Sequence, residues 1–511
     1  MSRLVAALDL RRPRLLGGVI VAATAILMAS VAPRAGAPAT GKSEFARGTQ
    51  LFADAKYREA VQALVRAREY DPQFTGQATR IVVRSLLRVG EFGRAEQEAS
   101  SLVSSTVGAE DLSLHAETLW GIGRFEEANA RYTAALTLDA GYPPALHGMA
   151  RVLDARGKTP DALVAVERAI EREPEVAEYH HTRAYLLERL RNYAVAADEL
   201  ERYLRYLPRK GFKEQVKLAR ARMKFLRHFG DRQPISLGAD TLTQVHVIPF
   251  REEREKLFVK AKINGRPTVE MVLDTGAEMT VLSEDTAQTA QVYSVAETLS
   301  AGVGDVGMRR LKLARIAKLE IGTLKVEHVP TMIKDPPLKK WPVADIDAFS
   351  PLAVGLSMRV DYVTRQLVVA RALPRAEGPA TMEAPLWMHR LATVRGRLNG
   401  DRAAAFVVDT GGQAISISRT AAVGLEQLGR FRRIPLRVFG SSGWDRDAFL
   451  LPGVDLEVDD VRMAQASLVV LNLRAPSVLL GYELGGILGH KFLSKYRVSL
   501  DLDGGLIRLD D

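Results

Sequence analysis

The sequence predicts a multidomain fold: an all-α solenoid of helix pairs, followed by an all-β region built from two similar lobes. Three observations support this prediction. Residues 44–208 repeat with a period close to 34 residues. From about residue 240 apolar and polar residues alternate, as they do in strands. A segment containing Asp-Thr-Gly occurs twice within that β region. The length of 511 residues is sufficient for several domains.

The N-terminal residues are predicted to direct export. Four arginines lie among the first 14 residues, an apolar run follows at residues 15–32, and small residues come next. This basic, apolar, small-residue order is typical of an export signal, and the run is also long enough for a single membrane anchor. We therefore expect residues 1–37 to be a signal peptide or an anchor, with the rest of the chain on the periplasmic or extracellular side.

The charge and the absence of cysteine limit the classes of function. The net charge is +10, and no cysteine is present, which excludes disulfides, thiolate metal sites and cysteine nucleophiles. Residues 209–228 carry eight Lys and Arg against one Glu. We interpret residues 209–240 as a solvated, helical connector, while attraction to an acidic partner or anionic lipid is the alternative. Because no aromatic-rich motif accompanies the charges, no nucleic-acid partner is predicted.

Within residues 44–208, five aligned segments repeat an alanine at intervals of 33 to 35 residues. These are Ala60, Ala95, Ala128, Ala162 and Ala196. Small residues at this period, with prolines near the repeat ends, resemble the tetratricopeptide repeat. The resemblance implies a concave face that binds a protein partner. A helix pair cannot bury its apolar face alone, so stacking of neighbours is required. We also expect this solenoid to be separable from the β region and to recruit a substrate or partner.

The β region divides into a first lobe at 241–370, a linker at 371–390 and a second lobe at 391–511. Each lobe begins with a strand, an Asn-Gly turn and a second strand that leads to Asp-Thr-Gly. The turn glycine precedes the aspartate by nine residues in both copies. The linker contains three prolines, so we expect it to be an exposed connector.

The two copies place one aspartate in each lobe, Asp274 and Asp409. Two carboxylates at close range share one proton, because both cannot ionise. The ionised group then draws a proton from water while the protonated group donates to a carbonyl, which is general acid–base hydrolysis without a metal or covalent intermediate. Each aspartate is followed by a threonine whose hydroxyl can bond across the lobe axis and a glycine that permits the turn: Thr275, Gly276, Thr410 and Gly411.

These residues resemble the retropepsin-like aspartic peptidases over about residues 250–511. The resemblance implies that Asp274 and Asp409 are the catalytic pair of an endopeptidase that cleaves peptide or protein substrates. The closing segment of the second lobe, residues 485–510, fits the family pattern, but that of the first lobe, residues 347–370, is degenerate. Because one chain holds both lobes, we expect an active monomer. A non-catalytic adaptor with degenerate lobes is the alternative.

A glycine-rich segment at residues 302–307 reads GVGDVG and formally fits a dinucleotide motif. The residues that follow alternate with period two, so a hairpin is expected instead of the helix that dinucleotide binding needs. The counterpart of this segment in the second lobe is FGSSGW at residues 439–444. The resemblance implies that these hairpins are flaps, with mobile glycines at Gly302, Gly304, Gly440 and Gly443. The histidines show no metal-ligand spacing, so neither a metal nor a cofactor is predicted.

Overall fold

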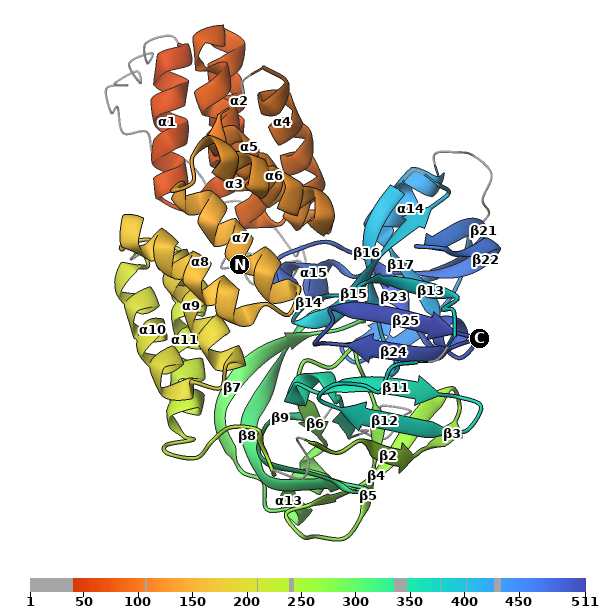
Figure 1. Ribbon diagram of the computed structural model, residues 1–511. Coiled ribbons are helices and arrows are strands. Elements are labelled where there is room, and N and C mark those ends of the chain that lie inside the picture. Colours follow the sequence, from red (N-terminus) through yellow and green to blue (C-terminus); the bar gives the residue numbers. More distant parts are fainter. Residues whose placement is uncertain are drawn as a thin grey trace, which may run out of the picture.

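The computed structural model describes residues 40–105, 108–208, 210–238, 243–334, 347–376, 378–400, 402–426 and 433–511. The predicted export segment, residues 1–37, lies outside these ranges. Within them, no helix is long and apolar enough to cross a membrane. Figure 1 shows the helical solenoid packed along one side of the β lobes.

The solenoid consists of helix pairs α1/α2 to α9/α10, followed by α11. The helices are α1 (Gly41–Ala53), α2 (Tyr57–Tyr70), α3 (Thr75–Val89), α4 (Phe92–Ser105), α5 (Ala109–Gly121), α6 (Phe125–Leu138), α7 (Pro143–Ala155), α8 (Thr159–Arg172), α9 (Ala177–Arg189), α10 (Tyr193–Tyr206) and α11 (Lys213–Arg227). Thr40 caps the first of them, because its side chain accepts a hydrogen bond from the Ser43 backbone N–H at 3.2 Å. The period of 34 residues is therefore one helix pair.

Small residues lie where the helices cross most closely. All five repeating alanines are completely buried, which confirms the register read from the sequence. Gly148 of α7 faces the ring of Tyr132 in α6, and a Cβ at Gly148 would approach that ring to 2.1 Å. Any larger side chain at this crossing would force the two helices apart.

The solenoid curls until repeats that are not neighbours touch. Arg88 of α3 forms an ion pair with Glu178 of α9, across three helix pairs. Lys210, which follows α10, lies 3.9 Å from Asp54, which follows α1. The first contact connects the second and fifth helix pairs, and the second connects the segments that follow α1 and α10.

The two β lobes share one topology. The first lobe has the strand order β1-β9-β6-β10-β5-β4-β8-β7, and the second has β14-β15-β16-β23-β17-β22-β21-β18. In each, the strand before Asp-Thr-Gly (β5 or β16) runs parallel to a central strand (β10 or β23), which pairs antiparallel with the strand after it (β6 or β17). The first-lobe strands are β1 (Ser236–Leu237), β3 (Arg251–Glu253), β4 (Lys256–Ile263), β5 (Val269–Leu273), β6 (Thr280–Leu282), β7 (Ser294–Ala301), β8 (Met308–Ile321), β9 (Leu324–Lys334) and β10 (Ala348–Phe349).

The second lobe repeats these elements with a longer central strand, five residues in β23 against two in β10. Its strands are β14 (Trp387–His389), β15 (Leu391–Leu398), β16 (Arg402–Val408), β17 (Ile415–Ser418), β18 (Ile434–Pro435), β21 (Phe449–Val458), β22 (Val461–Leu471) and β23 (Leu484–Leu488), with the separate hairpin β19 (Val438–Gly440) and β20 (Gly443–Asp445). Both predicted Asn-Gly turns join the expected strand pairs, β4–β5 and β15–β16. Their asparagines have positive φ, 51° at Asn264 and 49° at Asn399, as such tight turns require.

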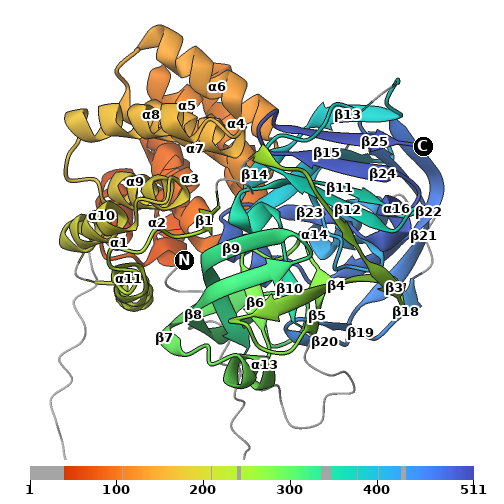
Figure 2. The same cartoon turned by 60° about the horizontal axis from the view of Figure 1, so that its bottom comes forward.

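A six-stranded sheet contains strands from both lobes. Its order is β13-β25-β24-β11-β12-β2, and β11 of the first lobe pairs directly with β24 of the second, Met358 opposite Leu500. Figure 2 shows this sheet between the two lobes. The strands are β2 (His246–Pro249), β11 (Ser357–Asp361), β12 (Gln366–Ala370), β13 (Met382–Pro385), β24 (Arg497–Asp501) and β25 (Leu506–Asp510).

The prediction of an exposed linker at residues 371–390 is wrong for its second half. Residues 382–389 form β13 and β14, and the side chains of Met382, Leu386 and Trp387 are buried. The prolines suggested a connector, yet a proline at a strand edge costs no ladder hydrogen bond. Within this segment, β13 pairs with β25 at the edge of the six-stranded sheet described above, and β14 pairs with β15 of the second lobe.

Three successive solenoid turns contact the β lobes. At the α5–α6 turn, the carbonyl of Gly121 accepts a hydrogen bond from the Glu483 N–H at 2.7 Å. At the α7–α8 turn, a Cβ on Gly157 would lie 2.8 Å from the carbonyl oxygen of Leu502. At the α9–α10 turn, the Arg191 guanidinium donates to the first-lobe carbonyl of Val354 at 3.3 Å. The solenoid thus bridges both lobes.

Apolar packing continues from the solenoid into the lobes. Phe125 of α6 contacts the rings of Trp387 and Tyr482, with centroids 5.4 and 5.1 Å away. Phe225 and Leu226 of α11 share a buried cluster with residues of β7 and β8. The expectation that the solenoid is a separable module is therefore wrong, because its removal would expose these faces to water.

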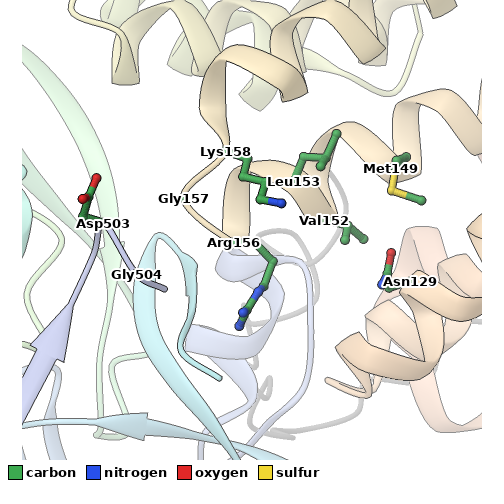
Figure 3. A pocket seen from close by; sticks show the side chains of 9 residues that line it. All are labelled: Asn129, Met149, Val152, Leu153, Arg156, Gly157, Lys158, Asp503 and Gly504. Carbon is green, nitrogen blue, oxygen red and sulfur yellow. The ribbon is translucent and has the colours of Figure 1, made fainter. Parts of the chain in front are cut away.

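A cavity of about 300 Å³ lies beside the contact at the α7–α8 turn (Figure 3). Its walls come from the solenoid and from the β24–β25 turn: Asn129, Met149, Val152, Leu153, Arg156, Gly157, Lys158, Asp503 and Gly504. In the α7–α8 turn, the Arg156 guanidinium lies over the Trp387 ring, 5.3 Å from the ring centroid. The cavity belongs to the docking contact between the solenoid and the second lobe.

Candidate active site

The two predicted aspartates occupy equivalent positions at the ends of β5 and β16. The N–H of Asp274 donates to the carbonyl of Phe349 at 2.9 Å, and the N–H of Asp409 donates to the carbonyl of Leu488 at 3.0 Å. In each lobe this partner lies on the short central strand, β10 or β23. The degenerate first lobe therefore keeps the backbone contact that positions its aspartate, although β10 has only two residues.

The two threonines hold the loops together by a reciprocal set of hydrogen bonds. The Thr275 hydroxyl donates to the carbonyl of Val408 at 2.6 Å, and the Thr410 hydroxyl donates to the carbonyl of Leu273 at 2.7 Å. Each hydroxyl also accepts the N–H of the other threonine, at 3.1 and 3.0 Å. Both threonines are about 1% exposed. Four buried hydrogen bonds therefore fix the two Asp-Thr-Gly loops against each other.

The carboxyl groups of Asp274 and Asp409 meet between the loops, each beside the glycine of the opposite loop. The two glycines make room for them. A Cβ on Gly276 would lie 2.8 Å from the Asp409 carboxyl carbon, and one on Gly411 would lie 2.6 Å from that of Asp274. Neither glycine can be replaced without displacing the opposite aspartate.

The hydrogen bonds to the two carboxylates are unequal. Asp274 accepts one backbone N–H, from Gly276 at 2.9 Å. Asp409 accepts two, from Gly411 at 2.9 Å and from Gly412 at 3.0 Å. Because backbone donors stabilise the ionised form, the negative charge of the pair is favoured on Asp409 and the shared proton on Asp274.

Burial is the main cause that raises the pKa of both carboxyl groups. The pKa of Asp274 rises to about 7, through desolvation first, then the charge of Asp409 and the hydrogen bond between them. The pKa of Asp409 is also raised by burial, but its hydrogen bonds to the glycine amides and to Asp274 oppose the rise. Lys256 lowers both pKa values by its charge. The pair therefore holds one proton at mildly acidic pH.

Other residues around the pair were not predicted from the sequence. Arg390 binds Glu278, which follows the first Asp-Thr-Gly loop, at 2.8 Å, and it also donates to the carbonyl of Leu479. In the second lobe, the Gln413 side chain donates to the Arg254 carbonyl at 2.8 Å. Each loop is thus tied to the opposite lobe. Arg390 was overlooked because it lies in the segment interpreted as a linker.

The two glycine-rich segments form hairpin tips that meet each other. Residues 302–307 join β7 to β8, and residues 441–442 join β19 to β20. The Ser442 N–H donates to the Val303 carbonyl at 2.8 Å, and the Asp305 N–H donates to the Trp444 carbonyl at 2.8 Å. The GVGDVG segment is therefore a hairpin tip, and no helix follows it.

The flap glycines lie at the contacts between the two tips. A Cβ at Gly304, whose φ is 136°, would lie 2.3 Å from the Ser442 backbone. A Cβ at Gly302 would meet the side chain of Ser441, and one at Gly440 would lie 2.4 Å from the Val303 carbonyl oxygen. At Gly443, φ is 103°. These positions need glycine for close approach or backbone conformation.

In the part of the chain that the structure describes, no three His, Cys, Asp or Glu side chains gather as potential metal ligands.

Comparison with known families agrees with this arrangement. A family model described as a gag-polyprotein putative aspartyl protease matches residues 259–341, and a tetratricopeptide repeat model matches residues 119–186. The first match lies in the first lobe and includes Asp274. The second runs from the last residues of α5 into α9, which it covers in part. The predicted order of a tetratricopeptide-like solenoid before a protease-like β region is confirmed. No curated protein matches the chain.

Several solved structures resemble part of the chain. One is a thermophilic tetratricopeptide repeat protein of Thermus thermophilus, with 20% identity, 37% of this chain and 98% of that chain covered, and a TM-score of 0.32. Another is PilF of Pseudomonas aeruginosa, with 20% identity, coverage of 38% and 85%, and a TM-score of 0.29. A third is MamA of Desulfovibrio magneticus, with 14% identity, coverage of 32% and 94%, and a TM-score of 0.26.

Proposed function

We propose that this protein is an aspartic endopeptidase whose catalytic pair, Asp274 and Asp409, comes from two lobes of one chain. The observation that carries the proposal is the placement of each carboxyl group against the glycine of the opposite loop, held by the reciprocal threonine contacts. Two carboxyl groups that share one proton can supply an acid and a base at the same time. A peptide or protein substrate is the class that this chemistry and the family match favour.

The unequal surroundings of the carboxyl groups assign their roles. Asp409, with two backbone donors, is the ionised base that takes a proton from an attacking water. Asp274 carries the proton and donates it to the carbonyl oxygen of the scissile peptide bond. Water adds to the carbonyl carbon, and a tetrahedral intermediate forms. Transfer of the proton from Asp409 to the leaving nitrogen then breaks the C–N bond, and Asp274 regains its proton.

A digestion of a peptide library by the full chain below pH 7 tests the proposal, since the pair keeps its shared proton there. We expect internal cleavage by the wild type, and none by Asp409→Asn at equal protein concentration. Asp285→Asn, which changes an exposed aspartate of α13 (Glu284–Thr289), is the matched control and should cleave normally. Equal cleavage by all three proteins would contradict the assignment.

A non-catalytic adaptor is the second candidate, and the closing segment of the first lobe favours it. Where the second lobe has Gly489 after its central strand, the first lobe has Ser350, completely buried and with a hydroxyl that lacks a hydrogen-bond partner. The adaptor would bind peptides without cleaving them. Peptide binding by wild type and Asp409→Asn alike, with no cleavage by either, would establish it.

We further propose that the protein is exported and that the solenoid binds a protein partner or substrate. The N-terminal basic and apolar segment supports export, and the tetratricopeptide match supports protein binding. Fusion of residues 1–40 to a reporter active only outside the cytoplasm tests export. An inactive reporter on a chain that is expressed would contradict it.

A further inference from the structure

The last solenoid helix, α11, carries a row of exposed basic side chains that its fold does not use. Lys213, Lys217, Arg220 and Lys224 are all exposed. Their spacing of four, three and four residues places them on one face of the helix. We name these four residues the α11 basic stripe. At about 1.5 Å per residue the row is roughly 16 Å long.

These four charges differ from the other basic residues of α11, which are paired. Arg222 binds Glu188 of α9, with its Nε 3.0 Å from the carboxylate, and Arg227 binds Glu201 of α10 at 2.9 Å. In the described residues, no ion pair or side-chain hydrogen bond involves a member of the stripe. Like charges three and four residues apart repel one another and reduce helix stability. The stripe therefore contains repulsive pairs that no ion pair offsets, although Lys224 lies in the last turn, where the helix dipole favours a cation.

The remaining surface of α11 excludes an apolar docking mode. Ala219, Phe225 and Leu226 are buried against the solenoid and the first lobe. The exposed face therefore has charge but no aromatic ring on which a base could stack, and that absence disfavours single-stranded nucleic acid. The exposed face of α11 therefore presents a straight row of three ammonium groups and one guanidinium group.

We propose that the α11 basic stripe docks this protein on the surface of an anionic lipid bilayer. A straight row of cations on a rigid helix can reach a planar anionic surface simultaneously, and each cation adds to the electrostatic attraction. A bilayer is favoured over a polyanion because the sequence contains an apolar run at residues 15–32 that is suited to a membrane. Binding of this kind is electrostatic and falls as salt increases.

The experiment compares three full-length proteins on vesicles of phosphatidylcholine alone and on vesicles that also contain phosphatidylglycerol. The stripe variant carries Lys213→Gln, Lys217→Gln, Arg220→Gln and Lys224→Gln. The matched control removes the same number of charges from exposed residues of the lobes: Lys260→Gln, Arg266→Gln, Lys325→Gln and Lys495→Gln. The apolar run is present in all three proteins, so its contribution is common to them.

We expect the wild type and the matched control to bind anionic vesicles about tenfold or more tightly than neutral ones, and the stripe variant to lose this difference. Because the native chain has no cysteine, Asp231→Cys beside α11 provides a single labelling site. A fluorophore there should be quenched by a lipid-borne quencher on anionic vesicles and not in high salt.

Three results would overturn the proposal. The first is equal preference for anionic vesicles in the stripe variant and the wild type. The second is the absence of any preference in the wild type. The third is tighter binding of duplex DNA than of anionic vesicles at the same ionic strength, which would identify a nucleic acid as the partner.

Discussion

At the scale of single residues, the site depends on small groups that cannot be exchanged for larger or less polar ones. The hydroxyls of Thr275 and Thr410 each donate one hydrogen bond and accept another. Both threonines are only about 1% exposed. The glycines beside them leave space for the opposite carboxyl group. The identity of these residues follows from the sequence motif. Their reciprocal partners, the carbonyls of Leu273 and Val408, follow only from the pairing of the lobes.

Thr410→Val should weaken both stability and cleavage. The substitution removes one donated and one accepted hydrogen bond and leaves the buried Leu273 carbonyl without this donor. We expect a loss of about 2–4 kcal/mol in the free energy of unfolding, measured by denaturant titration. Thr410→Ser keeps the hydroxyl and is the control. If valine and serine behave alike, the hydroxyl does not hold the loops together.

Asp274→Asn should increase the free energy of unfolding by an amount that depends on pH. The folded chain retains the Asp274 proton up to about pH 7, whereas an unfolded aspartate loses its proton near pH 4. Stability from this group is therefore present below about pH 4 and is lost as the pH rises toward 7. At pH 8 the variant should be more stable than the wild type by roughly 1–3 kcal/mol, with little gain at pH 4.

Thermal or denaturant unfolding at both pH values measures this difference. Asp231→Asn, at an exposed aspartate after α11, is the control and should show no such pH dependence. A gain of stability at pH 4 as large as that at pH 8 would show that ionisation of Asp274 is not its cause.

At the scale of elements, the two hairpin tips form one closed structure above two equivalent lobes. Their backbone hydrogen bonds connect the β7–β8 hairpin to the β19–β20 hairpin. Under the proposed function, an extended substrate would enter only after these contacts separate. The glycines at the tips permit the close approach.

Gly304→Ala should disrupt the closed flaps. Its Cβ would lie 2.3 Å from the Ser442 backbone, and its φ of 136° is unfavourable for alanine. We expect cleavage of peptides to fall about tenfold or more, since closure contributes to positioning of the substrate. Gly400→Ala is the matched control, because its φ is 81° and no atom lies within 4 Å of the added Cβ. Equal losses in both variants would attribute the effect to backbone strain alone.

The elements also show why some of the fold could be predicted and some could not. The alanine period and the Asn-Gly turns are local patterns, and both correspond to observed elements. The pairing of β11 with β24 and the burial of Trp387 depend on residues far apart in the sequence. The three prolines at residues 371–390 indicated a loop, but Pro385 ends the edge strand β13, and its pairing with Leu506 is a tertiary property.

At the scale of the whole molecule, the solenoid and the lobes form one packed unit. Gly121, Gly157 and Arg191 place three successive turns against the two lobes. Phe125 and Phe225 carry the apolar core across the boundary. The solenoid therefore contacts both lobes, in addition to the six-stranded sheet that joins them directly.

Gly157→Ala should weaken this docking. The added Cβ would lie 2.8 Å from the Leu502 carbonyl oxygen, whereas Gly265→Ala, at a similar positive φ, meets no atom within 4 Å. We expect Gly157→Ala to lower the free energy of unfolding by about 1 kcal/mol or more beyond the loss caused by Gly265→Ala. Lobes expressed without the solenoid should aggregate. A soluble, cleaving fragment that lacks the solenoid would contradict the role of these contacts.

The central claim is that both aspartates of the catalytic pair belong to the same chain, and mixing of inactive variants tests it most directly. Asp274→Asn and Asp409→Asn each remove one member of the pair, so each should abolish cleavage. If the pair is intramolecular, an equimolar mixture of the two variants stays inactive at every protein concentration, and the wild type has a specific activity independent of concentration. Recovery in the mixture to about a quarter of the wild-type activity would show that the pairs form between chains.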